Sequence, residues 1–187
     1  MQDFLFYFQM GWQHILSCEA ADHLLFITAL IAGYLCKSKQ QLFWVISAFT
    51  LGHFITLGLS AYDTIRFSRK WVEFLIPLTI IIAASKNILN NKTSFSYLLA
   101  LAFGLIHGMG FANAIRFMLA QDQHIAIPLF SFNVGLEAGQ IIVITFTLGL
   151  SYFMNKYVLR SPIIWKWMLS IIAIAGGIYM CFQRWPL

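Results

Sequence analysis

Residues 41–61, QLFWVISAFTLGHFITLGLSA, form an apolar stretch that contains no Lys, Arg, Asp or Glu. At about 1.5 Å of rise per residue, a helix of this length can cross the hydrocarbon core of a bilayer, which is about 30 Å thick. Inside the stretch lies one ionisable side chain, the imidazole of His53. We therefore expect a transmembrane helix here, with a titratable group in its interior.

The rest of the chain has the same apolar character. Of its 187 residues, 60% are hydrophobic and 10% are charged, and the mean hydropathy is +0.76. A soluble domain usually contains about a quarter charged residues. The composition predicts a single integral membrane domain over residues 1–187, with no room for a soluble catalytic domain. The net charge is +5, and we expect the basic side chains to contact lipid headgroups and not nucleic acid.

Polar clusters and prolines divide the chain into six long apolar segments. The predicted spans are residues 21–36, 41–61, 72–89, 96–118, 126–153 and 163–183. Residues 1–16 are also apolar, but they are too short to cross and lack the basic start and cleavage site of a signal peptide. The expected fold is an all-α polytopic membrane helix bundle with six full transmembrane spans and a short N-terminal interfacial or re-entrant helix.

Ionisable side chains are rare inside transmembrane segments, because each costs a few kcal/mol in hydrocarbon. This chain keeps at least six of them within its predicted spans, and His14 lies just before the first span. Counted from the predicted helix ends, they lie in one half of the bilayer, from its surface to a depth of roughly 16 Å. The six are Asp22, His23, His53, Glu73, His107 and Glu137.

Glycine pairs predict how the spans pack. Gly104 and Gly108 bracket His107, and Gly135 and Gly139 form a second GxxxG pair around Glu137. Such pairs let the backbones of neighbouring transmembrane helices approach closely. We expect the second, fourth and fifth spans to be mutual neighbours, and His53, His107 and Glu137 to face one another.

Imidazoles combined with carboxylates and an amide oxygen suit a borderline divalent ion such as Ni²⁺, Co²⁺ or Zn²⁺. Methionine and clustered thiolates, which Cu(I) prefers, do not belong to this set. The candidate metal-binding residues are His14, Asp22, His23, His53, Glu73, His107, Asn133 and Glu137.

Other interpretations of the same residues stay open. A catalytic Zn²⁺ with Glu73 or Glu137 as general base would make the protein an intramembrane hydrolase of lipid or peptide, although the motifs HExxH and GxSxG are missing from the chain. A metal sensor or assembly factor that does not transport is another candidate. Buried histidines also serve as hydrogen-bond donors between helices.

The motifs around these residues resemble a known family. They are GWQHIL at 11–16, DHLLF at 22–26, FTLGHFITL at 49–57, VEFLIPL at 72–78, FGLIHGMGFA at 103–112 and FNVGLEAGQ at 132–140. In this order they resemble the signature blocks of the hydrogenase/urease accessory membrane proteins, the HupE/UreJ family. The stretch ILSCEAA at 15–21 departs from the family pattern, because it is longer than the usual Asp-Gly turn.

The resemblance implies a small polytopic permease that supplies nickel or cobalt to metalloenzymes such as hydrogenase and urease, with maturation factors of those enzymes as partners. It implies a bacterial inner membrane, and the loop charges favour a polar site that opens to the outer side, with seven Lys and Arg in inner loops and five in outer ones. Carried over by motif, the metal path consists of His14, Asp22, His23, His53, Glu73, His107 and Glu137.

Overall fold

The structure, a computed structural model, describes residues 2–17, 20–35, 38–89, 96–119 and 125–186. Within these ranges the chain is helical and contains no strand, as the all-α prediction requires. The helices are α1 (Gln2–Leu16), α2 (Ala21–Tyr34), α3 (Lys39–Ala61), α4 (Arg69–Leu89), α5 (Tyr97–Leu119), α6 (Ala126–Phe153), the π-helical turn η2 (Met154–Val158) and α7 (Pro162–Gln183).

Four helical segments are each long and apolar enough to cross a membrane: α3, α4, α6 with η2, and α7. The pair α1 and α2 meets the same test together, with a bend of 68° between the two helices, as in a broken span or a re-entrant loop. The described residues thus contain four candidate spans, or five if this pair counts as one. The described part of α5 that is apolar throughout, Tyr97–Phe111, is shorter than a full span.

The predicted six-span count is therefore not confirmed. The largest difference lies in the predicted span 21–36, whose last residue is outside the described ranges. Helix α2 has 14 residues, which corresponds to about 21 Å at 1.5 Å per residue and is too short to cross alone. The preceding helix α1 is present as a separate element, in agreement with the expected short N-terminal helix.

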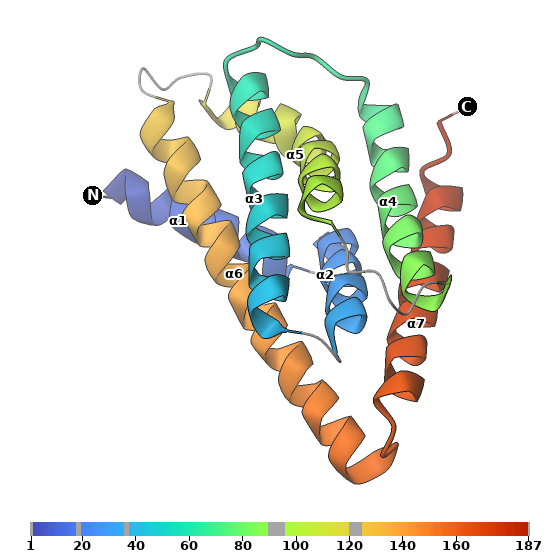
Figure 1. The fold of residues 1–187 in the computed structure, drawn as a ribbon. Helices are drawn as coiled ribbons and strands as arrows, with labels where there is room; N and C mark the ends of the chain where they lie inside the picture. The colour runs from blue at the N-terminus through green and yellow to red at the C-terminus, as the bar shows by residue number, and fades with distance from the viewer. Residues whose placement is uncertain (1, 18–19, 36–37, 90–95, 120–124, 187) are drawn as a thin grey trace.

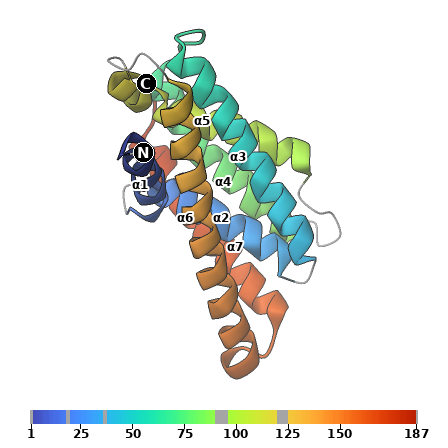
Figure 2. The ribbon, with the colours of Figure 1, turned by 90° about the vertical axis from the view of Figure 1, so that its left-hand side faces the viewer.

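Most of the helices pack in pairs, and α2 lies among these pairs (Figure 1). Helix α3 packs along α5, and α1 packs along α6, whereas α4 and α7 lie side by side and both contact α2. Helices α6 and α7 converge at η2, at the end of the molecule away from both termini (Figures 1 and 2). This arrangement surrounds the start of α2 with other helices.

Helix α3 approaches α5 at backbone distance. Gly104 of α5 lies against the carbonyl oxygen of Phe49 on α3, and Gly52 of α3 lies against the backbone of α5. A Cβ atom at either glycine would collide with this backbone. The predicted close approach around the first glycine pair is confirmed, and it places His53 and His107 on tightly packed helices.

Helix α1 makes the corresponding contact with α6. Gly135 lies against the carbonyl oxygen of Phe8, Gly11 lies against the carbonyl oxygen of Phe132, and the Ser131 hydroxyl donates a hydrogen bond to a backbone carbonyl of α1. The second glycine pair therefore also marks a close approach, but its partner is α1 and not another predicted span. The expected mutual packing of the second, fourth and fifth spans holds for α3 with α5 and is slight for α3 with α6. Among the described residues, α5 and α6 do not pack along each other, although the ring of Phe111 stacks on that of Phe132.

Candidate metal-binding site

Four histidines from four helices meet inside the bundle: His14 at the end of α1, His23 in the first turn of α2, His53 in α3 and His107 in α5. The ring centroid of His23 is 5.0 Å from that of His14, 6.0 Å from that of His53 and 5.2 Å from that of His107. One ring nitrogen from each of His14, His23 and His53 lies within 4.8 Å of the other two. Nitrogen ligands around one tetrahedral ion are about 3.3 Å apart, so small side-chain rotations would bring these three onto a metal.

Hydrogen bonds determine which nitrogen of two rings faces the cluster. Nδ1 of His23 lies 2.9 Å from Oδ1 of Asp22, and Nδ1 of His107 lies 2.9 Å from the carbonyl oxygen of Phe103. Both partners are acceptors, so Nδ1 carries the proton and the neutral ring keeps a lone pair on Nε2. Metal-binding histidines have this arrangement, with one nitrogen held by a carboxylate or carbonyl and the other free for the ion.

The free nitrogens are buried and have no hydrogen-bond partner among the described residues. They are Nε2 of His14, His23 and His107 and both ring nitrogens of His53, whose side chain is 0% exposed. Buried polar groups are hydrogen-bonded in the large majority of cases, and each exception requires an explanation. One of the two His53 nitrogens carries a proton in the neutral ring, so the four rings can offer four lone pairs at once, and a metal ion would accept them.

A cavity of about 190 Å³ adjoins the histidines and contains two acidic side chains, Asp22 and Glu73. Glu73, in the first turns of α4, accepts a hydrogen bond from Nε of Arg69 at 2.6 Å. Asp22 is nearly buried, and its second oxygen accepts a hydrogen bond from Arg184 at 3.0 Å. The cavity is therefore lined by imidazoles, by Glu73, which pairs with the exposed Arg69, and by the largely buried pair of Asp22 and Arg184.

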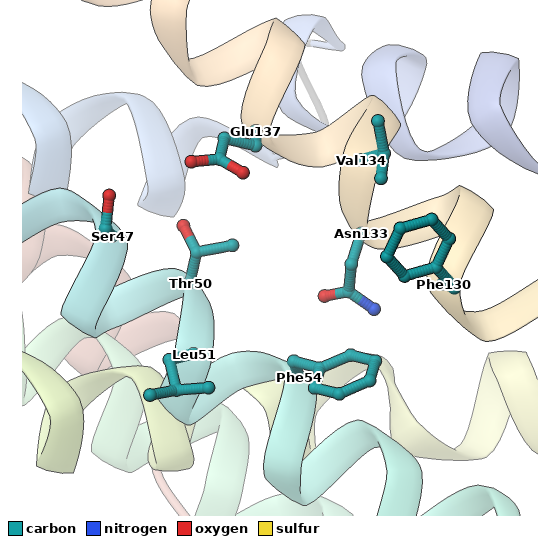
Figure 3. Close-up of a pocket in the computed structure, with 8 residues that line it drawn as sticks. All are labelled: Ser47, Thr50, Leu51, Phe54, Phe130, Asn133, Val134 and Glu137. Carbon is teal, nitrogen blue, oxygen red and sulfur yellow. The ribbon is translucent and has the colours of Figure 1, made fainter. Parts of the chain in front are cut away.

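A second pocket, of about 260 Å³, lies between α3 and α6. Figure 3 shows Asn133 and Glu137 on α6 opposite Ser47 and Thr50 on α3. The amide of Asn133 donates to the carbonyl oxygen of Leu129, and its Oδ1 atom is buried with no hydrogen-bond partner in the part of the chain that the structure describes. This pocket thus offers two side-chain oxygen ligands from one helix, separated by a single turn.

The comparisons with known proteins agree with this chemistry. The family model described as "HupE / UreJ protein" matches residues 1–184, essentially the whole chain. The chain belongs to the HupE/UreJ family. Among curated proteins and solved structures, none matches. The HupE/UreJ family and the apolar helices identify an integral membrane protein of the accessory class related to nickel and cobalt.

In this HupE/UreJ protein, the structure divides the residues predicted from the sequence into two groups. The first group forms the histidine cluster and lines its cavity. It consists of His14, Asp22, His23, His53, Glu73 and His107. The second group, Asn133 and Glu137, lines the other pocket, and Asn133 also lies next to the ring of His53. Glu137 does not line the cavity of His23 and His107 as described, so the expectation that it faces His53 and His107 is not confirmed.

Arg184 lines the histidine cavity, and the sequence analysis of this HupE/UreJ protein did not select it. In the sequence, Arg184 follows the last predicted span and lies on the same predicted side of the membrane as the acidic residues. Basic residues at a span end are usually assigned to the membrane surface. Only the packing of α7 against α2 shows its proximity to Asp22.

Proposed function

We propose that this protein is a permease for divalent transition metals, with nickel and cobalt as the first candidates and zinc as a further one. The observation that carries the proposal is the cluster of buried, unpartnered imidazole nitrogens from four helices. Imidazole is a ligand for Ni²⁺, Co²⁺ and Zn²⁺, whereas Mg²⁺ and Ca²⁺ prefer oxygen ligands. The family to which the chain belongs supports nickel and cobalt.

The metal ion would pass through two binding stations, the histidine cavity and then the second pocket. Glu73 and Asp22 attract the cation at the mouth of the cavity, and the ring nitrogens of His14, His23, His53 and His107 replace part of its hydration shell. The ring of His53 lies next to Asn133, which lines the second pocket, so it is the histidine through which the ion would reach Asn133 and Glu137. Transport requires that each station binds weakly enough to release the ion to the next.

We also propose how the protein is placed in the membrane. Six full spans over residues 1–187, a location in the bacterial inner membrane, and a cavity that opens to the outer side would make the protein an importer. Metalloenzymes of nickel or cobalt, such as hydrogenase and urease, would then receive the metal. The apolar helices and the family support a bilayer location, and the acids at the cavity mouth support cation capture from that side.

The test is metal uptake into liposomes that contain the purified protein, measured for Ni²⁺, Co²⁺ and Zn²⁺ together with calorimetric titration of each ion. We expect exchangeable binding and uptake of at least one of them, and no uptake of Mg²⁺ or Ca²⁺. Absence of binding by all three ions would refute the proposal.

A second candidate function, a metal-dependent hydrolase, is favoured by one observation. Three histidines around one point, with Asp22 behind His23, resemble the ligand set of a catalytic zinc ion, and Glu73 in the same cavity would serve as general base. Tight binding without uptake would favour the hydrolase or a non-transporting sensor. Release of fatty acid or peptide from a model substrate would separate these two.

A further inference from the structure

Arg184 holds its guanidinium group against the acidic residue of the histidine cluster. Its Nη1 atom donates to Oδ2 of Asp22 at 3.0 Å, and the two side chains are 26% and 10% exposed. The other carboxylate oxygen, Oδ1, accepts from the backbone N–H and from the ring Nδ1 of His23. One carboxylate thus contacts both a protein cation and the ring whose other nitrogen faces the metal-binding cluster.

The position of Arg184 is set by contacts on both sides along the chain. Its backbone N–H donates to the carbonyl oxygen of Met180 in the last turn of α7. The next residue, Trp185, packs edge to face on Phe74 of α4, with 5.3 Å between the ring centroids. Phe74 follows Glu73 directly, so this contact holds the segment at the mouth of the cavity, where Figure 1 shows the end of α7 beside the start of α4.

A guanidinium group in this place opposes the binding of a metal cation. Arginine stays protonated at all physiological pH values, so its charge can leave the cavity only by movement of the side chain. A divalent ion at the histidine cluster would be repelled by this charge, and the repulsion is stronger in a partly buried cavity than in water. The guanidinium also draws negative charge of Asp22 away from His23, which reduces the basicity of the ring as a ligand.

We propose that the positive charge of Arg184 opposes binding of the transported metal ion. In the metal-free protein Arg184 neutralises Asp22, and in the loaded protein its positive charge lowers the affinity for the metal and speeds release toward the second pocket. The inference rests on the proposed function, because it assigns a residue that sets the metal affinity of the same site. Arg184 acts through Asp22 and does not itself coordinate the ion.

A purely structural role of Arg184 makes the opposite prediction. If its only effect were to hold Asp22 in place behind His23, its removal would loosen the ligand and weaken metal binding. The direction of the change in affinity therefore distinguishes the two roles.

The experiment is calorimetric titration of the purified full-length protein with NiCl₂, together with the rate of Ni²⁺ release into a chelator. We expect Arg184→Gln to bind Ni²⁺ about tenfold more tightly than the wild type, after allowance for solvent screening of a partly exposed charge, and to release it more slowly. Arg184→Lys keeps the charge and should stay close to the wild type. Arg66→Gln is the matched control, because Arg66 forms an exposed ion pair with Asp63 outside the cavity.

Trp185→Ala provides a second test that leaves the cavity residues unchanged. It removes the contact with Phe74 that holds the segment of Arg184 in place. Ni²⁺ should therefore bind more tightly than to the wild type, by a smaller factor than for Arg184→Gln. Equal or weaker Ni²⁺ binding by Arg184→Gln or by Trp185→Ala would overturn the role of Arg184 while the proposed function stands. Failure of the wild type to bind any of the three metals would instead refute the proposed function itself.

Discussion

The carboxylate of Asp22 fixes the imidazole of His23 through a 2.9 Å hydrogen bond between Oδ1 and Nδ1. The same oxygen accepts the backbone N–H of His23 at 2.8 Å, so the carboxylate cannot rotate freely. This pair selects the tautomer that exposes the lone pair of Nε2 to the other histidines. A short dipeptide at the start of α2 thereby prepares one ligand of the site before any metal binds.

The role of this pair is tested by Asp22→Asn, which keeps an oxygen next to His23 but removes the charge. We expect affinity for Ni²⁺ to fall by about 10- to 100-fold, as for other residues that support a metal-binding histidine. Calorimetric titration measures the effect. Asp63→Asn is the control, because Asp63 pairs with Arg66 at the exposed start of the loop before α4; an equal loss in both variants would contradict the assignment.

His53 should destabilise the metal-free protein while it serves the site. Both of its ring nitrogens are buried without a hydrogen-bond partner among the residues described, and an unsatisfied buried polar group costs about 1–3 kcal/mol. His53→Leu is therefore expected to raise the melting temperature of the metal-free protein and to remove most metal binding. Thr56→Val should lower the melting temperature, because the Thr56 hydroxyl donates to the carbonyl oxygen of Leu105 across the α3–α5 interface. A lower stability of His53→Leu would mean that its ring makes favourable contacts that outweigh the burial cost.

The contact between α3 and α5 leaves no room for a side chain at Gly104, because the carbonyl oxygen of Phe49 occupies that place. Gly104→Ala should destabilise the protein by about 1–3 kcal/mol, the usual cost of overpacking. The same substitution at Gly149 of α6 meets no atom within 4 Å and should be tolerated. Thermal unfolding in detergent compares the two variants, and a tolerated Gly104→Ala would contradict the packing described for this interface.

The separation of the two pockets predicts that binding and transport respond to different substitutions. Glu137→Gln alters the second pocket only, so it should slow uptake into liposomes and leave Ni²⁺ affinity at the histidine cluster unchanged. His23→Ala should abolish both. If Glu137→Gln also removed binding, the two groups of residues would have to act as one site, and a series of two stations would be wrong.

The sequence was sufficient for the fold class and for much of the candidate site. Mean hydropathy and the scarcity of charge identify membrane helices, since they depend on local composition alone. His53 and His107 stand out for the same reason, because a polar group in an apolar run is costly wherever the helix is placed. The glycine pairs indicated close packing correctly, although the sequence did not reveal that α1 is the partner of Gly135.

Tertiary structure decided which polar residues share a cavity. Glu137 carries the same sequence signal as His53 and His107, yet it lines another pocket than His107. Arg184 and Asp22 lie 162 residues apart in the sequence and meet at 3.0 Å. Burial cost is a property of each residue, and the sequence displays it. Proximity depends on the rotation, tilt and bending of whole helices, and these are set by contacts between distant segments, which no local pattern of hydropathy contains.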